Sequence, residues 1–161
     1  LGIEPDDMKA GLSNTKLLPQ RYEVEKYQGL TIINDAYNAN PRSMQEALDT
    51  LKNYRCEGRR FFVIGDMLEL GNLAEPAHIK LGTEVTKSAI DYLITVGELS
   101  AHVAKSAIAS GMNKKQIATA SENKCAVAFL KKNTRPGDCL LVKGSRSSKM
   151  EEVVKHLTDE I

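Results

Sequence analysis

The chain has 161 residues, 42% of them hydrophobic and 27% charged, which is typical of one globular domain. Lys and Arg total 22 against 21 for Asp and Glu, and a net charge of +1 gives no sign of the positive surface that binds nucleic acid or anionic membranes. No stretch approaches the roughly 20 apolar residues of a membrane span, and the first residues lack the apolar core of a secretion signal. We therefore expect a soluble, cytoplasmic protein with a small-molecule partner.

The three cysteines are far apart in the sequence and form no C-x-x-C pair. An odd number without metal-ligand spacing argues against a disulfide framework or a zinc site. We expect reduced, buried thiols at Cys56, Cys125 and Cys139.

Strands and helices alternate along the chain. An alternating segment at 22–27 and a β-branched run at 30–34 predict a hairpin with its turn at Gln28-Gly29. Apolar periodicity then predicts further elements in chain order. These are a helix at 41–54, a strand at 61–64, a helix at 75–88, a strand at 92–96, a helix at 99–110, a short strand at 116–120, a helix at 122–132, a strand at 139–142 and a helix at 150–157.

Short apolar strands separated by helices predict βαβ crossovers. The fold class that we expect is therefore α/β, a doubly wound, mostly parallel Rossmann-like sheet with helices on both faces. The ligand site of such a sheet lies at the carboxyl ends of its strands. Four polar segments leave predicted strands there: NDAYNANP at 34–41, GDMLELG at 65–71, VGE at 96–98 and KGSRSSK at 143–149.

The segment at 34–41 has the strongest site chemistry. The carboxylate of Asp35 can accept hydrogen bonds from ribose hydroxyls, as acidic residues do in dinucleotide-binding folds. The carboxamides of Asn38 and Asn40 both donate and accept, which suits a zwitterionic peptide. Alternatively, Asn40 only caps the helix that begins at Pro41, and Asp35 only starts a turn. Three such residues at one strand end favour a site.

The segment at 65–71 allows two interpretations. Asp66 and Glu69 can position a cationic group or a metal, or Asp66 can start a turn. His78, early in the next helix, can contact a ligand, but a surface position is the expected one. No Ser/His/Asp or Cys/His triad and no pair of histidines at metal spacing is predicted.

The segment at 143–149 places Lys143, Ser145 and Arg146 just past the last strand. Cations beside small residues at a strand-to-helix turn suit a carboxylate or a phosphate, and Arg146 can bind bidentately. A solvated basic turn is the alternative. The full G-x-x-x-x-G-K-[ST] spacing of a P-loop does not occur in the chain.

Residues 1–18 are interpreted as the tail of a preceding ATPase domain and a hinge, with a short helix at 6–12 and an irregular stretch after it. The domain itself is expected to span 19–161. Because the chain opens on Leu1 without a start methionine, we expect a fragment of a longer protein. Arg21, which follows the hinge, could reach a phosphate bound by another domain.

Several of these segments together resemble the C-terminal domain of the Mur ligases, the ATP-dependent amide-forming enzymes of bacterial peptidoglycan synthesis. The likeness is greatest to the members that add D-alanyl-D-alanine. It is carried by R-Y-E at 21–23, NDAYNANP-x-S-M at 34–44, GDMLELG at 65–71, His78, VG at 96–97, GD at 137–138 and KGSR at 143–146.

The resemblance implies a parent of three domains, with UDP-N-acetylmuramoyl-tripeptide, ATP and D-alanyl-D-alanine as ligands. ATP would phosphorylate the tripeptide carboxylate, and the dipeptide amine would attack the acyl phosphate, with Mg²⁺ held mainly by the central domain. By this resemblance Arg21 reaches the ATP phosphates and Asp35 holds the ribose. The residues implied on the substrate side of the cleft are Tyr37, Asn38, Asn40, Lys143, Ser145 and Arg146.

The central P-loop and the sugar-binding domain are not in the sequence, so this fragment alone is expected to be inactive. Two other interpretations stay open. One is the same domain from a ligase of the folylpolyglutamate or cyanophycin type, and the other is a stand-alone nucleotide-binding or interaction module.

Overall fold

The fold is known from a computed structural model that describes residues 4, 6–7 and 19–159. The predicted helix at 6–12, apart from residues 6 and 7, and most of the predicted hinge lie outside the described residues. The strands are β1 (Glu23–Tyr27), β2 (Leu30–Asn34), β3 (Arg60–Gly65), β4 (Tyr92–Val96), β5 (Ile117–Ala120) and β6 (Cys139–Lys143). The helices are α2 (Pro41–Asn53), α3 (Ala74–Thr86), α4 (Ser100–Ala109), α5 (Asn123–Asn133) and α6 (Glu151–Thr158), with short 3-10 turns at Gly71–Leu73, Lys114–Gln116 and Arg146–Ser148.

The six strands form one sheet in the order β1-β2-β6-β3-β4-β5. The β1–β2 hairpin is antiparallel, and the other neighbouring pairs are parallel. Its turn places Gln28 at φ 47° and Gly29 at φ 81°, the left-handed backbone that a tight hairpin requires. The predicted mostly parallel sheet is confirmed, and the largest shift of an element's end is in α3, predicted to end at Ser88 and observed to end at Thr86.

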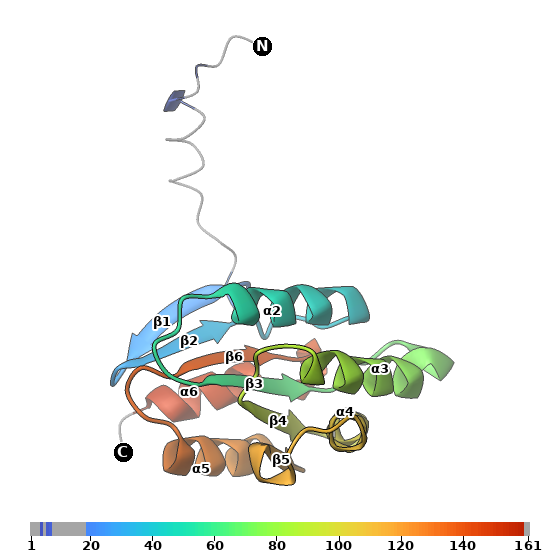
Figure 1. Cartoon of the computed structure of the whole chain (residues 1–161). Helices are drawn as coiled ribbons and strands as arrows, with labels where there is room; N and C mark the ends of the chain where they lie inside the picture. Colours follow the sequence, from blue (N-terminus) through green and yellow to red (C-terminus); the bar gives the residue numbers. More distant parts are fainter. Residues whose placement is uncertain (1–3, 5, 8–18, 160–161) are drawn as a thin grey trace.

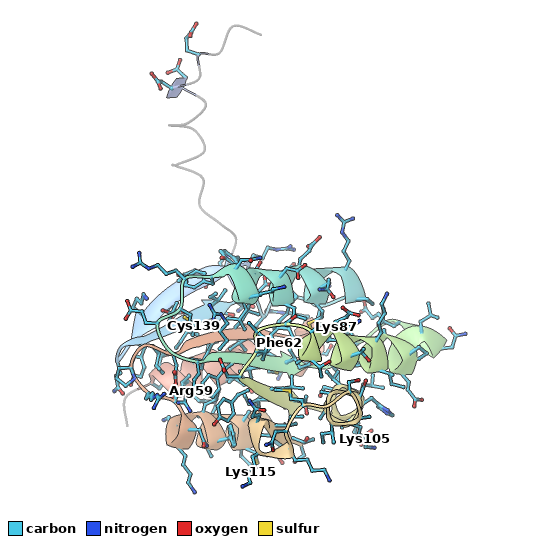
Figure 2. All side chains as sticks on the ribbon, viewed as in Figure 1. Arg59, Phe62, Lys87, Lys105, Lys115 and Cys139 are labelled. Atoms are coloured by element: carbon cyan, nitrogen blue, oxygen red, sulfur yellow. The ribbon has the colours of Figure 1, made fainter. Side chains whose placement is uncertain are left out.

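Helices cover both faces of the sheet, as predicted (Figure 1). Helices α2, α3 and α4 pack on one face around Phe62, Ile64 and Leu93. Helices α5 and α6 pack on the other face around Phe61 and Val63. Successive residues of β3 therefore point into two separate cores, as the alternation of a doubly covered strand requires. Figure 2 shows the buried side chain of Phe62 inside these layers.

The order of the strands changes direction after β5. Strands β3, β4 and β5 follow one another toward one side of the sheet, and the chain then returns to place β6 between β2 and β3. We call the side where β2, β3 and β6 end the carboxyl edge, and the opposite side the amino edge. The polar segments that follow these strands therefore emerge side by side at the carboxyl edge.

The three cysteines are free thiols, but they do not share one environment. Cys139 is buried and Cys56 is half-buried, whereas Cys125 is exposed, so the prediction of a buried thiol is wrong for Cys125. Residue 125 lies in the first turn of α5, outside the apolar stripe of that helix. Burial, together with the neighbouring Cys56, raises the pKa of Cys139 to about 11, so this thiol stays protonated at neutral pH.

Within the residues that the structure describes, no helix is long and apolar enough to cross a membrane.

Candidate functional site

Three loops meet at the carboxyl edge: the Asp35 loop (34–41) after β2, the Asp66 loop (65–71) after β3 and the Lys143 loop (143–149) after β6. Ser145, only 5% exposed, joins them. Its N–H donates to the Asp66 carbonyl at 3.0 Å, and its Oγ accepts from the Leu68 N–H at 2.8 Å. The same Oγ lies 3.5 Å from the Ala39 carbonyl as a donor. Ser145 therefore ties the three loops together, and a direct contact with a ligand stays a prediction.

Lys143, the last residue of β6, forms an ion pair with Asp35. Its Nζ lies 2.5 Å from Asp35 Oδ2, and the side chains of Lys143 and Asp35 are 4% and 23% exposed. The second carboxylate oxygen of Asp35 accepts from the Tyr22 N–H at 3.3 Å. The lysine is thus buried behind the carboxylate, and the carboxylate keeps part of its surface open to solvent.

Asp35, Asn38 and Lys143 line one hollow of about 450 Å³, so the predicted grouping of these three side chains is present. Arg21, Tyr37 and Asn40 line the same hollow. Residues of the Asp35 loop and of α2 from Ser43 to Thr50 line it. Its lining includes two carboxylates, those of Asp35 and Glu46, with an arginine, two phenols and two carboxamides.

Two arginines approach the ring of Tyr37, which is 42% exposed. The guanidinium carbon of Arg21 lies 4.1 Å from the ring centroid, and that of Arg146 lies 5.8 Å away. Arg146 also donates to Gln20 Oε1 at 2.5 Å, and the Tyr37 N–H donates to the Gln20 carbonyl at 3.0 Å. The segment before β1 is therefore attached to the Asp35 loop through Tyr37, and Arg21 lines the hollow while Arg146 does not.

Asn38 and Asn40 are both engaged by the backbone. Oδ1 of Asn38 accepts from the Ala39 N–H at 2.8 Å. Oδ1 of Asn40 accepts from the Ser43 N–H at 2.9 Å, and Ser43 Oγ accepts from the Asn40 N–H at 3.0 Å, which completes a capping box. Asn40 therefore caps α2 through Oδ1, the alternative raised by the sequence. A ligand contact through its amide N–H groups stays a prediction.

Asp66, which the sequence analysis considered as a ligand group, holds its own loop in place. Asp66 Oδ1 accepts from the Ser100 N–H at 2.7 Å, at the start of α4, so Asp66 has a structural hydrogen bond. Gly97 passes so close to this carboxylate that a Cβ would lie 2.5 Å from Oδ1. Glu69 adopts φ 64°, in the left-handed region.

His78 is fully buried, so the predicted surface position is wrong. Its Nε2 accepts from the Met67 N–H at 3.0 Å, and its Nδ1 lies 2.6 Å from the Ala74 carbonyl. These partners require a neutral ring with the proton on Nδ1. The ring holds the Asp66 loop through the Met67 N–H. The separation of residues 67 and 78 could have suggested this contact only if the start of α3 had been known.

Sequence reasoning missed a second hollow of about 560 Å³ at the same edge, beside β4 and β5. It is lined by Asp66, Leu68, Val96, Gly97, Ser121, Glu122, Asn123, Lys124, Ser147, Ser148, Glu152 and His156. The segments at 65–71 and 143–149 contribute to it, whereas its residues from α5 and α6 carry no motif. Only the packing of α5 against α6 brings them to the edge.

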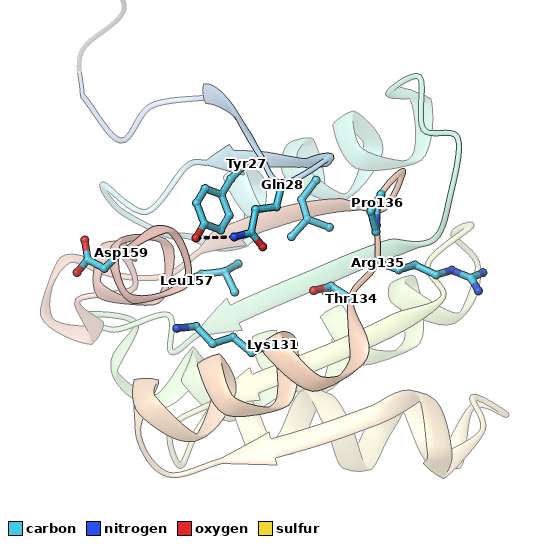
Figure 3. Close-up of a pocket in the computed structure, with 9 residues that line it drawn as sticks. Tyr27, Gln28, Lys131, Thr134, Arg135, Pro136, Leu157 and Asp159 are labelled. Atoms are coloured by element: carbon cyan, nitrogen blue, oxygen red, sulfur yellow. Dashed lines mark hydrogen bonds between the residues drawn. The ribbon is translucent and has the colours of Figure 1, made fainter. Parts of the chain in front are cut away.

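A third hollow, of about 530 Å³, lies at the amino edge and is separate from the polar loops. Figure 3 shows Tyr27, Lys131, Pro136 and Leu157 around it, with Gln28 bonded to the Tyr27 hydroxyl at 3.1 Å and Arg135 pointing away. Its position excludes it from the site at the carboxyl edge.

The described residues contain no group of three or more His, Cys, Asp or Glu side chains that could hold a metal ion. The carboxyl edge offers groups for a sugar hydroxyl, an anion and an amide.

Comparisons with known proteins agree with this architecture. The UDP-N-acetylmuramoyl-tripeptide--D-alanyl-D-alanine ligase of Bacillus subtilis is 40% identical over 98% of this chain and 35% of its own length. A crystal structure of MurF from Acinetobacter baumannii superposes with a TM-score of 0.86 at 25% identity, over 99% of this chain and 35% of that one. MurF ligase from Thermotoga maritima, solved in complex with ADP, gives a TM-score of 0.76 at 26% identity, over 91% and 32%.

The chain thus spans 35% of the length of the curated relative from Bacillus subtilis. Residues 20–146 match the family described as "Mur ligase, glutamate ligase domain". This match covers the hairpin, the whole sheet, the Asp35 and Asp66 loops and the first four residues of the Lys143 loop. The chain therefore belongs to the Mur ligase family and carries its glutamate ligase domain.

Proposed function

We propose that this chain is the C-terminal domain, here called the closing domain, of an ATP-dependent ligase that adds D-alanyl-D-alanine to UDP-N-acetylmuramoyl-tripeptide. One observation carries the proposal. The partly exposed carboxylate of Asp35 shares a hollow with Arg21, Tyr37 and Asn38, in a chain 40% identical to a ligase of that name. In this proposal residues 19–161 form the closing domain, and residues 1–18 connect it to a preceding ATPase domain.

The hollow fits part of a nucleotide. Ionised carboxylates only accept hydrogen bonds, and ribose hydroxyls donate them, so Asp35 suits the sugar. Arg21 contacts only the face of Tyr37 among the interactions described above, and its guanidinium can turn to a phosphate. Because the described residues present no acidic cluster, the proposal assigns the ligands of Mg²⁺ to another part of the longer protein.

The dipeptide is proposed to lie on the same side of the cleft. Tyr37, Asn38 and Asn40 offer a ring face and carboxamides to a zwitterion, which needs acceptors for its ammonium and donors for its carboxylate. Arg146, at the open side, supplies a cation for a carboxylate. Lys143 and Ser145 belong to the same edge, where their hydrogen bonds hold the loops in place.

This chain alone is predicted not to catalyse ligation and to bind ATP only weakly. The relatives are about three times as long, and the phosphate-binding P-loop is absent from the sequence. Ribose contacts without a phosphate site leave about 4 kcal/mol or less, which is millimolar affinity or weaker. Titration calorimetry of this chain with ATP measures it, and micromolar binding would contradict the proposed division of the site.

The decisive test uses the longer protein that contains this chain. ADP release is measured with three pairs of acid and amine: UDP-N-acetylmuramoyl-tripeptide with D-alanyl-D-alanine, a folate with L-glutamate, and cyanophycin with its amino acids. We expect turnover with the dipeptide alone. Turnover with L-glutamate would support a ligase of the folylpolyglutamate type instead, and absence of turnover with every amine would favour a nucleotide-binding module.

The same assay tests the residue assignment through Asp35→Asn. The amide keeps an oxygen for Lys143 but loses the charge, and a hydrogen bond to a charged group contributes about 1.5–3 kcal/mol. We expect the KM for ATP to rise about 10- to 150-fold. Asp49→Asn, an equal change of charge at an exposed position of α2 outside the hollow, is the matched control and should change nothing.

A further inference from the structure

The ammonium group of Lys143 has no free donor in this structure. Its Nζ lies 2.5 Å from Asp35 Oδ2, 2.9 Å from the Asn38 carbonyl and 3.4 Å from the Asp35 carbonyl. An ammonium group has three N–H donors, and here three oxygens accept them. The residue as a whole is 3% exposed. A ligand in the hollow therefore meets the carboxylate of Asp35 before it meets the cation.

The three acceptors all come from the Asp35 loop, within four consecutive residues. A carboxylate and two backbone carbonyls converge on one point, so the loop is wrapped around the ammonium. A buried ammonium is costly unless its charge is paired and its hydrogen bonds are made. The conformation of the loop and the burial of Lys143 therefore depend on each other.

The ion pair also decides which oxygen of Asp35 is offered to a ligand. Oδ2 is held by Lys143, and Oδ1 is held more loosely by the Tyr22 N–H at 3.3 Å. A carboxylate oxygen can accept more than one hydrogen bond, so Oδ1 has capacity left. The carboxylate cannot rotate without breaking the short bond to Lys143.

Arg146, another cation of the Lys143 loop, is not enclosed by the Asp35 loop in this way. The side chain of Arg146 is 61% exposed, and its contacts are with Gln20, with the Tyr37 ring and, at 3.6 Å, with Glu151. Arg146 can move toward an anion without unmaking a buried pair, whereas Lys143 cannot. Sequence reasoning had given both residues the same role.

We propose that Lys143 is a positioning residue for nucleotide binding: it clamps Asp35 Oδ2 and the carbonyls of Asp35 and Asn38, so that Oδ1 faces the ribose. This inference rests on the proposed function, since it specifies how the nucleotide side of the site is held. Lys143 acts through Asp35 and touches neither the tripeptide nor the dipeptide.

The test is Lys143→Met in the longer protein, because methionine fills the space of the lysine stem without its charge. Equilibrium binding is measured for ATP and for 2′-deoxy-ATP and 3′-deoxy-ATP, and KM for each substrate. The wild type should bind ATP about tenfold or more tightly than the deoxy-nucleotide that lacks the hydroxyl in contact with Asp35. In Lys143→Met that preference should vanish and ATP binding should weaken by a similar factor. KM for the dipeptide, which is proposed to contact the same loop, should rise by a smaller factor, and KM for the tripeptide should change less than twofold.

A double-mutant cycle separates this role from direct substrate binding. If Lys143 acts through Asp35, the variant with both Lys143→Met and Asp35→Asn binds ATP about as weakly as Asp35→Asn alone. Additive losses, or a KM increase confined to the dipeptide or the tripeptide, would overturn the inference. Lys105→Met, which removes an exposed lysine from α4, is the matched control.

Separate control experiments test the folding of the variant and the function of the wild type. Thermal unfolding followed by circular dichroism checks that Lys143→Met is folded, and Lys143→Gln, which keeps two N–H donors without the charge, replaces it if it is not. A wild type that ligates another amine would overturn the proposed substrate, while the deoxy-nucleotide binding still decides the role of Lys143. A wild type without preference between ATP and either deoxy-nucleotide would overturn the inference itself.

Discussion

At each edge of the sheet, within the described residues, an ion pair joins two neighbouring strands that are far apart in the sequence, and the two pairs are built in opposite ways. At the amino edge Asp138 is fully buried and its partner Arg59 is 24% exposed. At the carboxyl edge the cation Lys143 is 4% exposed, and the acid Asp35 is 23% exposed. The buried member is therefore the acid at one edge and the cation at the other.

The hydrogen bonds of the two acids explain the difference. Asp138 Oδ1 accepts from the backbone N–H of Arg59 at 2.8 Å, and Oδ2 accepts from Arg59 Nη2 at 2.7 Å and from the Arg135 N–H at 3.0 Å. Burial by itself would raise the pKa of Asp138, but these bonds outweigh it and hold the pKa below its usual value. Asp138 has no capacity left for a ligand, whereas Asp35 keeps an oxygen at an open hollow.

The comparison therefore separates a structural pair from one that can serve a ligand. Arg59 also donates to the Asn133 carbonyl at 2.6 Å, so the amino-edge pair joins β3 and β6 to the end of α5. Removing it should affect folding. Removing Asp35 should affect binding first.

Asp138→Ala should have the largest effect on stability. Breaking a buried ion pair by removing one partner costs about 3–5 kcal/mol, because the remaining group loses its charge partner and hydrogen bonds. The partly exposed Arg59 can regain some water, which favours the lower end of that range. Urea unfolding of this chain measures the loss, and a change below about 1 kcal/mol would show that the two edges are not different in the way described.

Acid unfolding sharpens the same contrast. The pKa of Asp138 is lower in the folded chain than the ordinary value of 3.8, so its stabilisation is complete above that value and disappears as the pH falls through the lowered native pKa. Below about pH 4 the unfolding free energy of the wild type should therefore fall more steeply than that of Asp138→Asn. Parallel curves for the two proteins would exclude Asp138 as a source of the acid sensitivity.

Much of the fold could be predicted because its signals are local. Pro41 after Asn40 marked the start of α2, and the spacing of Met44, Leu48 and Leu51 marked its buried face, which the structure confirms. Gly111, at φ 104°, closely follows the end of α4, which was predicted at residue 110 and lies at Ala109. Such signals need only a few neighbouring residues, so one sequence contains them.

The site could be predicted only in part, because its decisive contacts join distant positions. Strand ends gave the residues around Asp35, but not that Lys143, 108 residues later, turns toward the loop and pairs with Asp35. The burial of His78 depends on the path of the Asp66 loop above it, and a single histidine on a helix does not reveal that path. Asp138 appeared only within the GD motif at 137–138, and nothing in the sequence pointed to its ion pair with Arg59, 79 residues away.

Asn40 provides the smallest and most selective test, because it combines features of both edges. Its Oδ1 caps α2, a structural role like that of Asp138, and it lines the hollow like Asp35. Asn40→Ala should lower the stability by about 1 kcal/mol through loss of the cap, and Asn40→Ser should restore it because serine caps equally well. If the amide N–H groups of Asn40 also bind the dipeptide, KM for D-alanyl-D-alanine should stay raised in both variants of the longer protein.

The serine variant decides between the two roles, since it separates the cap from the carboxamide. A normal KM together with restored stability in Asn40→Ser would assign Asn40 to the helix alone. Urea unfolding of this chain gives the first quantity, and ADP release at varied dipeptide gives the second. An acid or amide at the carboxyl edge would then count as a ligand group only where, as at Asp35, its hydrogen bonds within the fold leave part of it free.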